Sequence, residues 1–319
     1  LVERLKNRRV PEITTALQDK AIAQLDWKDL DAIGRAQSPG FDAGLLVRDV
    51  RGSVKGMGTD ENRLFKALQG RTPIQIAAMR KAYASFYPGR NMDDDVLSDT
   101  EFSEEDRAKA MLSGDPVASA AATLQDAMWG AGTDEKLVMD TLRGKTPAER
   151  DAIMDKYKEM YGVDLRERIK DDMEDNDRDQ AEALLTGDTP KADAIAVNEA
   201  MDGPGTDEDA IHAVYSRIRD EVEADARSKG MTTAEVNAEI ERRTGALKAA
   251  YGAKYAQDDP NKLEADFKDD LEDGELNLVL AEQANDQTAM DAARIQIEHE
   301  GLYTDDDKID TGGRRYAPQ

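Results

Sequence analysis

The hexapeptide Gly56-Met57-Gly58-Thr59-Asp60-Glu61 decides the fold, because it returns twice more along the chain. It recurs as Gly130-Ala131-Gly132-Thr133-Asp134-Glu135 and again as Gly203-Pro204-Gly205-Thr206-Asp207-Glu208. The three threonines are 74 and 73 residues apart, so the repeating segment is about 73 residues long. Self-similarity at a fixed period is the sequence signature of a repeat architecture.

Each repeat has the sequence pattern of several short helices. Thr146 and Glu149 predict a capping box at the start of one helix, and residues 72–75 carry the same start signal in the first repeat. The apolar residues that follow, such as Ile153 and Tyr157, are spaced for one face of a helix. Five helices per repeat and no convincing strand predict an all-α fold, an array of five-helix repeats.

The repeats also set the expected domain organisation. Residues 1–40 are expected to form a partial N-terminal helical segment. A long charged stretch, Arg219–Arg243, lies in the third repeat, and we interpret it as lengthened helices. In the last segment Tyr303 stands where the second glycine belongs, so this repeat is degenerate and truncated. The expected boundaries of repeats 1 to 4 are 41–114, 115–187, 188–286 and 287–319.

The composition excludes several classes of protein. With 43 basic and 68 acidic side chains the formal charge is −25, and such a surface repels phosphate backbones, so no nucleic acid partner is expected. There is no cysteine, and His212 and His299 are too few for a histidine metal centre, so any metal must be held by oxygen. We expect His212 to be an ordinary packed or exposed side chain.

No apolar run is long enough to span a membrane, and no secretion signal opens the chain. The chain begins with Leu1, and we expect it to be part of a longer protein.

The repeated Gly-x-Gly-Thr segment has three candidate explanations. It can cradle a phosphate, but it lacks the lysine of a Walker loop and no strand precedes it. It can be a turn before a helix, and we expect Thr133 to be the N-cap of that helix. A cap does not explain the paired glycines, nor the aspartates that follow the three threonines by 40, 39 and 64 residues, namely Asp99, Asp172 and Asp270. Ca²⁺ fits both observations, because it takes about 6–8 oxygen ligands from carbonyls and carboxylates.

These motifs resemble the annexins, whose repeats of about 70 residues have five helices and a calcium loop of the form Met-Lys-Gly-x-Gly-Thr. In that family an Asp or Glu about 38 residues later closes the site, and the resemblance extends over residues 41–304. Only the first loop keeps the family's lysine, as Lys55; Trp129 and Asp202 replace it in the others. The resemblance implies Ca²⁺ as the cofactor, bound by the carbonyls of Val54, Gly56 and Gly58 with Asp99; of Met128, Gly130 and Gly132 with Asp172; and of Met201, Gly203 and Gly205 with Asp270.

The expected function is calcium-dependent binding to the surface of anionic phospholipid membranes. Three carbonyls and a bidentate carboxylate leave roughly one to three coordination positions for water or a lipid phosphate. With one carboxylate per ion, we expect a dissociation constant of about 10⁻⁴–10⁻³ M.

No carboxylate pair with the spacing of an acid–base dyad stands out, so an enzyme is not expected. The expected location is cytoplasmic, and peripheral to a membrane when calcium is bound. The alternative is a structural or protein-interaction module, in contact with other parts of a longer parent chain, whose membrane binding has lapsed.

Overall fold

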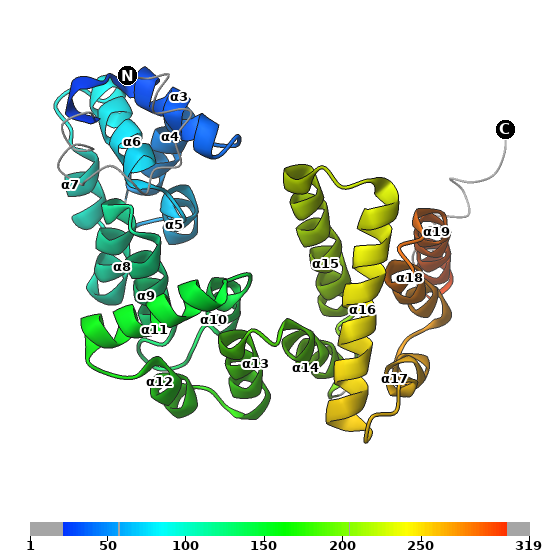
Figure 1. Ribbon diagram of the computed structural model, residues 1–319. Helices are drawn as coiled ribbons and strands as arrows, with labels where there is room; N and C mark the ends of the chain where they lie inside the picture. The colour runs from blue at the N-terminus through cyan, green and yellow to red at the C-terminus, as the bar shows by residue number, and fades with distance from the viewer. Residues whose placement is uncertain (1–21, 57, 204, 305–319) are drawn as a thin grey trace, which may run out of the picture. The chain divides into compact units, whose positions relative to one another are not determined.

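The computed structural model describes residues 22–56, 58–203 and 205–304. The described residues are mainly α-helical and contain no strand, which confirms the predicted all-α class (Figure 1). They form two compact bodies, which we call the N-terminal body, up to Met173, and the C-terminal body, from Glu174 onward.

Each of the three sequence repeats contains five helices in the same order, as predicted. Helix α3 (Trp27–Gln37) precedes repeat 1, and α19 (Gln287–Thr304) follows repeat 3. Repeat 1 comprises α4 (Ala43–Ser53), α5 (Glu61–Leu68), α6 (Pro73–Phe86), α7 (Met92–Leu97) and α8 (Phe102–Ser113). Repeat 2 comprises α9 (Pro116–Ala127), α10 (Glu135–Leu142), α11 (Pro147–Tyr161), α12 (Leu165–Asp172) and α13 (Asp175–Thr186). Repeat 3 comprises α14 (Thr189–Met201), α15 (Glu208–Lys229), α16 (Thr233–Tyr255), α17 (Lys262–Asp270) and α18 (Asp273–Gln283).

The predicted start signals are present as capping boxes. The side chain of Thr146 accepts from the backbone of Glu149, whose carboxylate accepts from the backbone of Thr146, and α11 begins at the proline between them. Thr72 and Thr232 begin α6 and α16 in the same way. Such reciprocal bonds satisfy two backbone donors that the first helical turn leaves unpaired. The third helix of repeats 1 and 2 therefore starts where the sequence predicts.

The glycine loop of each repeat follows the repeat's first helix, whose inner face is fully buried. In α4 this face consists of Val47 and Val50, both 0% exposed, and the corresponding residues of α9 and α14 are equally buried. The long third helices contribute a second apolar face, which includes Tyr83 and Tyr157. Burial of such side chains contributes about 1.5–3 kcal/mol each, so the core fixes where each helix ends and each loop begins.

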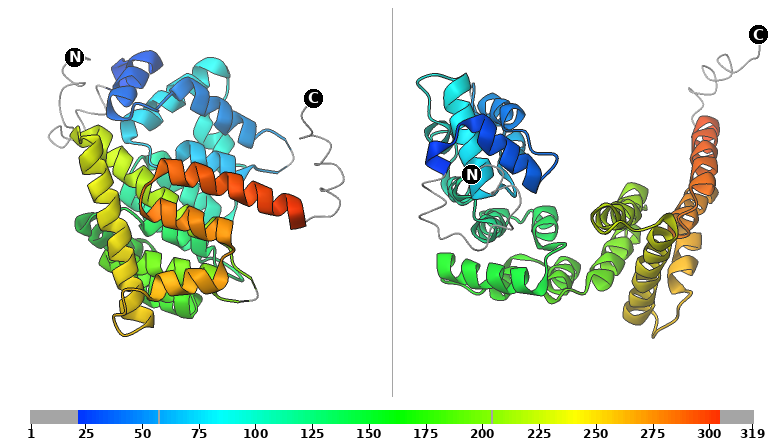
Figure 2. Two further views of the ribbon diagram at one scale, coloured as in Figure 1. Left: turned by 90° about the vertical axis from the view of Figure 1, so that its right-hand side faces the viewer. Right: turned by 45° about the horizontal axis from the view of Figure 1, so that its top comes forward.

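The charged stretch in repeat 3 forms longer helices, as interpreted from the sequence. Helix α15 has 22 residues and α16 has 23, whereas α5 and α10, the counterparts of α15, have eight each (Figure 2). The guanidinium of Arg243 on α16 joins the two extensions, with Nη1 3.1 Å from the Glu221 carboxylate and Nη2 3.5 Å from that of Asp225. The added turns are thus held together by charge.

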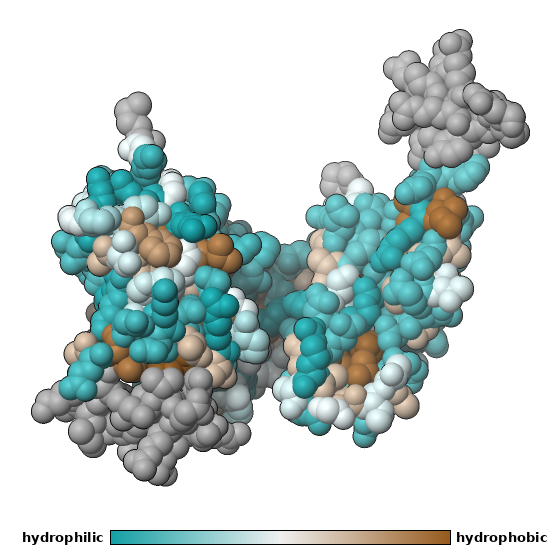
Figure 3. Space-filling view, turned by 90° about the horizontal axis from the view of Figure 1, so that it is seen from above, coloured by the Kyte–Doolittle hydropathy of each residue, from teal (hydrophilic) through white to brown (hydrophobic). Residues whose placement is uncertain are grey.

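The surface in the view of Figure 3 is mostly hydrophilic, in keeping with a chain that is 35% charged. Among the described residues no helix combines the length and the apolar character needed to cross a bilayer.

Candidate calcium loops

Each glycine motif lies in a loop that a backbone hydrogen bond closes. We call these loop 1 (residues 54–60), loop 2 (128–134) and loop 3 (201–207); they lead from α4 to α5, from α9 to α10 and from α14 to α15. In every loop the last aspartate donates its backbone N–H to the carbonyl of the residue seven positions earlier. These bonds are Asp60 to Ser53 at 3.1 Å, Asp134 to Ala127 at 2.8 Å and Asp207 to Ala200 at 2.7 Å.

The two glycines of each loop have a backbone conformation that explains their presence. Their φ angles are positive, between 88° and 142° in all six cases. A Cβ atom built on any of them would have no neighbour within 4 Å, so the surrounding space does not require glycine. The requirement comes from the backbone, because side chains other than glycine rarely adopt this region.

The threonine of each loop contacts the aspartate that the sequence predicts for the same site. The hydroxyl of Thr59 donates to the backbone carbonyl of Asp99 at 2.6 Å and to its carboxylate at 2.9 Å. The hydroxyl of Thr133 donates to the carbonyl of Asp172 at 3.0 Å, and that of Thr206 to the carbonyl of Asp270 at 3.1 Å. The structure therefore brings loop and distant aspartate together in all three repeats.

This contact corrects the expected role of Thr133. The N-cap of α10 is Asp134, whose side chain accepts from the backbone N–H of Leu137 at 2.9 Å. Asp60 and Asp207 cap α5 and α15 in the same way. Since the aspartate caps the helix, the threonine hydroxyl is available for the partner 39 residues away. Both residue types were visible in the motif, and both fit an N-cap, so sequence alone did not separate their roles.

Loop 2 differs from the others by a guanidinium at its predicted ligands. Arg168 on α12 places Nε 2.5 Å from Oδ2 of Asp172, and its Nη2 donates to the backbone carbonyl of Met128. One side chain thus contacts both kinds of predicted ligand. Arg168 is not among the residues predicted for this site, although the i, i+4 spacing of Arg168 and Asp172 on one helix indicates such a pair.

Loop 3 borders a hollow of about 580 Å³ that contains all four of its predicted ligands. Extra carboxylates reach the same hollow because the turn from α17 to α18 lies beside the loop. This site is therefore more negatively charged than the single carboxylate that the resemblance implies. The lining residues are Met201, Gly203, Gly205, Thr206, Glu208, Asp269, Asp270, Glu272 and Glu275.

His212 lies next to this region and is packed between two glutamates. Its Nε2 is 2.9 Å from the carboxylate of Glu275, and its Nδ1 is 2.8 Å from that of Glu282. Burial lowers the pKa of His212, but the hydrogen bonds to Glu282 and Glu275 outweigh that effect, so the pKa is raised above 6.5. His212 is thus a packed side chain, as expected, and in addition it links α15 to α18.

Loop 1 lies beside a basic hollow of about 540 Å³. Two of its arginines, Arg51 and Arg90, share the carboxylate of Asp95, at 3.5 Å and 3.0 Å. Neither Arg48 nor Lys55 forms an ion pair with a described residue. In a chain of charge −25 this is a local excess of positive charge. The lining residues are Arg48, Arg51, Gly52, Lys55, Phe86, Tyr87, Pro88 and Arg90.

The donor set of the loops suits a hard cation. Carbonyl and carboxylate oxygens are the ligands that Ca²⁺ prefers. Among the described residues no three or more His, Cys, Asp or Glu side chains form a metal cluster, so these loops would depend on carbonyls for most of their ligands. The last segment, in which Tyr303 replaces the second glycine, offers no such loop at residues 301–304, because α19 continues through them.

Sequence comparisons find similarity to one family, and its model covers loop 2. The family model named Annexin matches residues 119–180. Annexin A5 of Mus musculus is 32% identical over 134 residues, which are 42% of this chain and 41% of that protein. Annexin A13 of Canis lupus familiaris is 28% identical over 281 residues, 85% of this chain and 81% of that protein. Together these matches support an annexin-family protein.

Annexins are generally calcium-dependent phospholipid-binding proteins without enzymatic activity. The chain spans half or less of the length of the mouse relatives that it matches, 41% of annexin A5 and 50% of annexin A13. Among solved structures, annexin III has a TM-score of 0.30 at 21% identity, covering 76% of this chain and 71% of that chain. Calcium-bound alpha-14 giardin has a TM-score of 0.29 at 17% identity, covering 88% and 96%. The family assignment rests on the sequence matches alone.

Proposed function

We propose that this annexin binds Ca²⁺ at its three loops and that the bound ions attach it peripherally to anionic phospholipid. The observation that carries this proposal is the threonine–aspartate hydrogen bond, which recurs in all three repeats. It brings one carboxylate-bearing residue to each glycine loop, where the carbonyls predicted as ligands lie. Such a combination of oxygen donors suits Ca²⁺ and leaves positions for an external oxygen.

The residues of each loop have separate tasks in this proposal. The glycines bend the backbone so that carbonyls can face one point, and the threonine holds the aspartate at the loop. Asp99, Asp172 and Asp270 supply the carboxylates. Bound Ca²⁺ would supply the positive charge that attracts a lipid phosphate, and by reciprocal coupling the lipid raises the affinity for calcium.

The residues around each loop differ, so the three loops contribute differently to membrane contact. The basic hollow beside loop 1 attracts an anionic headgroup directly. Trp129 in loop 2 is 57% exposed, and tryptophan favours the interfacial zone of a bilayer. At loop 3 the carboxylates of the acidic hollow strengthen the attraction for a cation but repel anionic lipid. We therefore assign lipid contact mainly to loops 1 and 2.

Co-sedimentation with vesicles of phosphatidylserine and phosphatidylcholine tests the proposal. We expect binding in calcium and none in chelator. Asp99→Asn should raise the calcium concentration for half-maximal binding by about tenfold, because it removes the charged ligand of loop 1. Asp94→Asn is the matched control, since Asp94 is an exposed carboxylate on α7 outside the loop. Equal sedimentation in calcium and chelator would exclude the calcium bridge.

The alternative function, a protein-interaction module, is favoured by one observation. The guanidinium of Arg168 already contacts the predicted ligands of loop 2. If calcium titration gives no vesicle binding at any concentration, and the chain instead forms a stable complex with another part of its parent protein, this second function is the correct one.

A further inference from the structure

A comparison among the repeats isolates Arg168 as a residue particular to loop 2. The position four residues before the predicted ligand is Asp95 in repeat 1 and Asp266 in repeat 3, and it is Arg168 in repeat 2. Asp95 and Asp266 accept hydrogen bonds from Tyr83 and Tyr251, at 2.6 Å and 2.7 Å. Repeats 1 and 3 thus have an acidic side chain at the position where repeat 2 has a basic one.

The contacts of Arg168 lie on the site itself. Its Nε is 2.5 Å from Oδ2 of Asp172, and its Nη2 donates to the carbonyl of Met128, which closes the end of α9. Oδ2 of Asp172 is fully buried, and Arg168 is 31% exposed. In repeat 1, by contrast, the corresponding carboxylate of Asp99 accepts from the hydroxyl of Thr59 in the loop.

We propose that Arg168 is a tethered cation that competes with Ca²⁺ for loop 2. This inference rests on the proposed calcium binding and adds the order in which the loops take up calcium. A positive charge next to the entering ion opposes it, and the ligands Met128 and Asp172 become available only when the guanidinium leaves. Loops 1 and 3 have no such residue at the equivalent position. Loop 2 therefore takes up calcium at higher concentrations than the other two.

Trp129 provides a probe for loop 2 alone, because it stands between two predicted ligands of that loop. Terbium(III), which replaces Ca²⁺ at oxygen sites, luminesces when an indole close to it is excited. Trp129→Phe should remove this signal, which assigns it to loop 2; the other tryptophan, Trp27, lies on α3 and packs edge-on against Phe86. Competition by calcium against terbium then measures the calcium affinity of loop 2.

We expect Arg168→Gln to raise the affinity of loop 2 for calcium by about fivefold, the factor that a partly exposed ion pair supplies at its upper value. Lys170→Gln on the same helix removes an equal charge from an exposed side chain and should leave the affinity unchanged. Arg168→Asp, which copies repeats 1 and 3, should give at least the effect of Arg168→Gln. An unchanged affinity in both Arg168 variants, or an equal change in Lys170→Gln, overturns the proposal.

Thermal unfolding gives a second measurement that does not depend on luminescence. In chelator, Arg168→Gln should unfold at a lower temperature than the unaltered chain, because the link between α12 and α9 is lost. In excess calcium this difference should shrink or reverse, because a ligand that binds only the folded state stabilises it more when its dissociation constant is lower.

The two proposals fail in different ways. If the unaltered chain sediments with vesicles in calcium but Arg168→Gln changes neither affinity nor unfolding, only the role of Arg168 is wrong. If no loop binds calcium in any variant, both proposals are wrong.

Discussion

The hydroxyl of Thr59 donates to both the backbone carbonyl and the carboxylate of Asp99, 40 residues farther along the chain. This one side chain joins loop 1 to the residue that follows α7. Thr59→Val keeps the shape of the side chain and removes the donor. We expect it to lower the free energy of unfolding by about 1–2 kcal/mol, because the part-buried acceptors lose their partner.

The same variant should require several-fold more calcium for vesicle binding, since Asp99 is no longer held at the loop. Thr59→Ser restores the hydroxyl and should recover both properties. Urea unfolding and co-sedimentation measure the two effects. Wild-type behaviour in Thr59→Val would show that the hydrogen bond does not position the aspartate.

Backbone conformation predicts opposite effects for two glycine-to-alanine substitutions, one in loop 2 and one in a helix. Gly132 has a φ of 113°, so Gly132→Ala should destabilise by about 1–3 kcal/mol through backbone strain. Gly245 lies in the interior of α16 with open space around the site of a Cβ atom. Gly245→Ala should therefore stabilise by about 0.5–1 kcal/mol. Urea unfolding checks both signs, and a stabilising Gly132→Ala would contradict the assigned loop conformation.

His212 predicts a pH dependence of the C-terminal body. Its pKa is raised in the folded state, so its contribution is fully present below about pH 6.5 and is lost as the pH rises through the raised value. We expect the free energy of unfolding to fall across this range, because the imidazolium that Glu275 and Glu282 stabilise loses its charge.

His212→Gln should remove this part of the pH dependence. Urea unfolding followed by far-ultraviolet circular dichroism at pH 6 and pH 8 measures this change. Tryptophan fluorescence does not report on the C-terminal body, because Trp27 and Trp129 both lie in the N-terminal body. Tryptophan fluorescence then serves as a control that His212→Gln should not alter. An identical pH dependence in the variant would refute the prediction.

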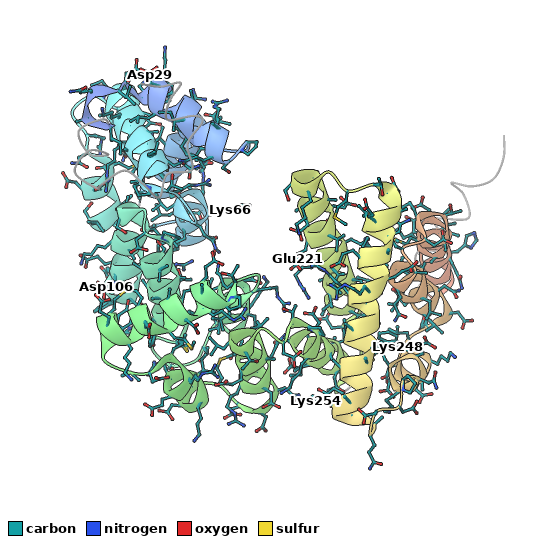
Figure 4. The ribbon with its side chains drawn as sticks, in the orientation of Figure 1. Asp29, Lys66, Asp106, Glu221, Lys248 and Lys254 are labelled. Atoms are coloured by element: carbon teal, nitrogen blue, oxygen red, sulfur yellow. The ribbon has the colours of Figure 1, made fainter. Side chains whose placement is uncertain are left out.

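The basic hollow predicts that lipid binding depends on positive charge near loop 1. The double variant Arg48→Gln/Lys55→Gln should weaken vesicle binding in calcium by about 2 kcal/mol, at about 1 kcal/mol per charge near an anionic surface. Neither side chain forms an ion pair with a described residue, but the Arg48 guanidinium lies 5.7 Å from the centroid of the Phe86 ring, so urea unfolding must show that the variant is still folded. The control is Lys66→Gln/Lys145→Gln, which removes two lysine charges outside the hollow; Figure 4 shows Lys66 on α5. Equal weakening in both double variants would indicate a general charge effect.

Much of the fold could be predicted from the sequence because its signals are local. Capping boxes at Thr72 and Thr146 and the apolar spacing around Tyr157 fix helices within a few residues of each other. The glycine motif and the distance to Asp99 or Asp172 also suggested which loop faces which aspartate. These predictions depend on a repeating pattern, and the pattern was present three times.

The remaining features depend on which side chains of different helices meet. Arg168 reaches Met128 across 40 residues, and no local rule predicts that contact. The carboxylates around loop 3 gather because the start of α18 lies beside the loop, which sequence spacing does not indicate. The division of labour between Thr133 and Asp134 was missed for another reason, because both side chains are good helix caps.

The length of α15 makes the turn at its C-terminal end a suitable place to attach a label. Its 22 residues rise about 33 Å at 1.5 Å per residue, so the turn at Gly230 is one helix length away from loop 3. A fluorescent dye or an affinity peptide inserted at that exposed turn would stand clear of the glycine motif at the opposite end. The distance between such a label and a bilayer would then report directly how the helix is tilted when the protein docks.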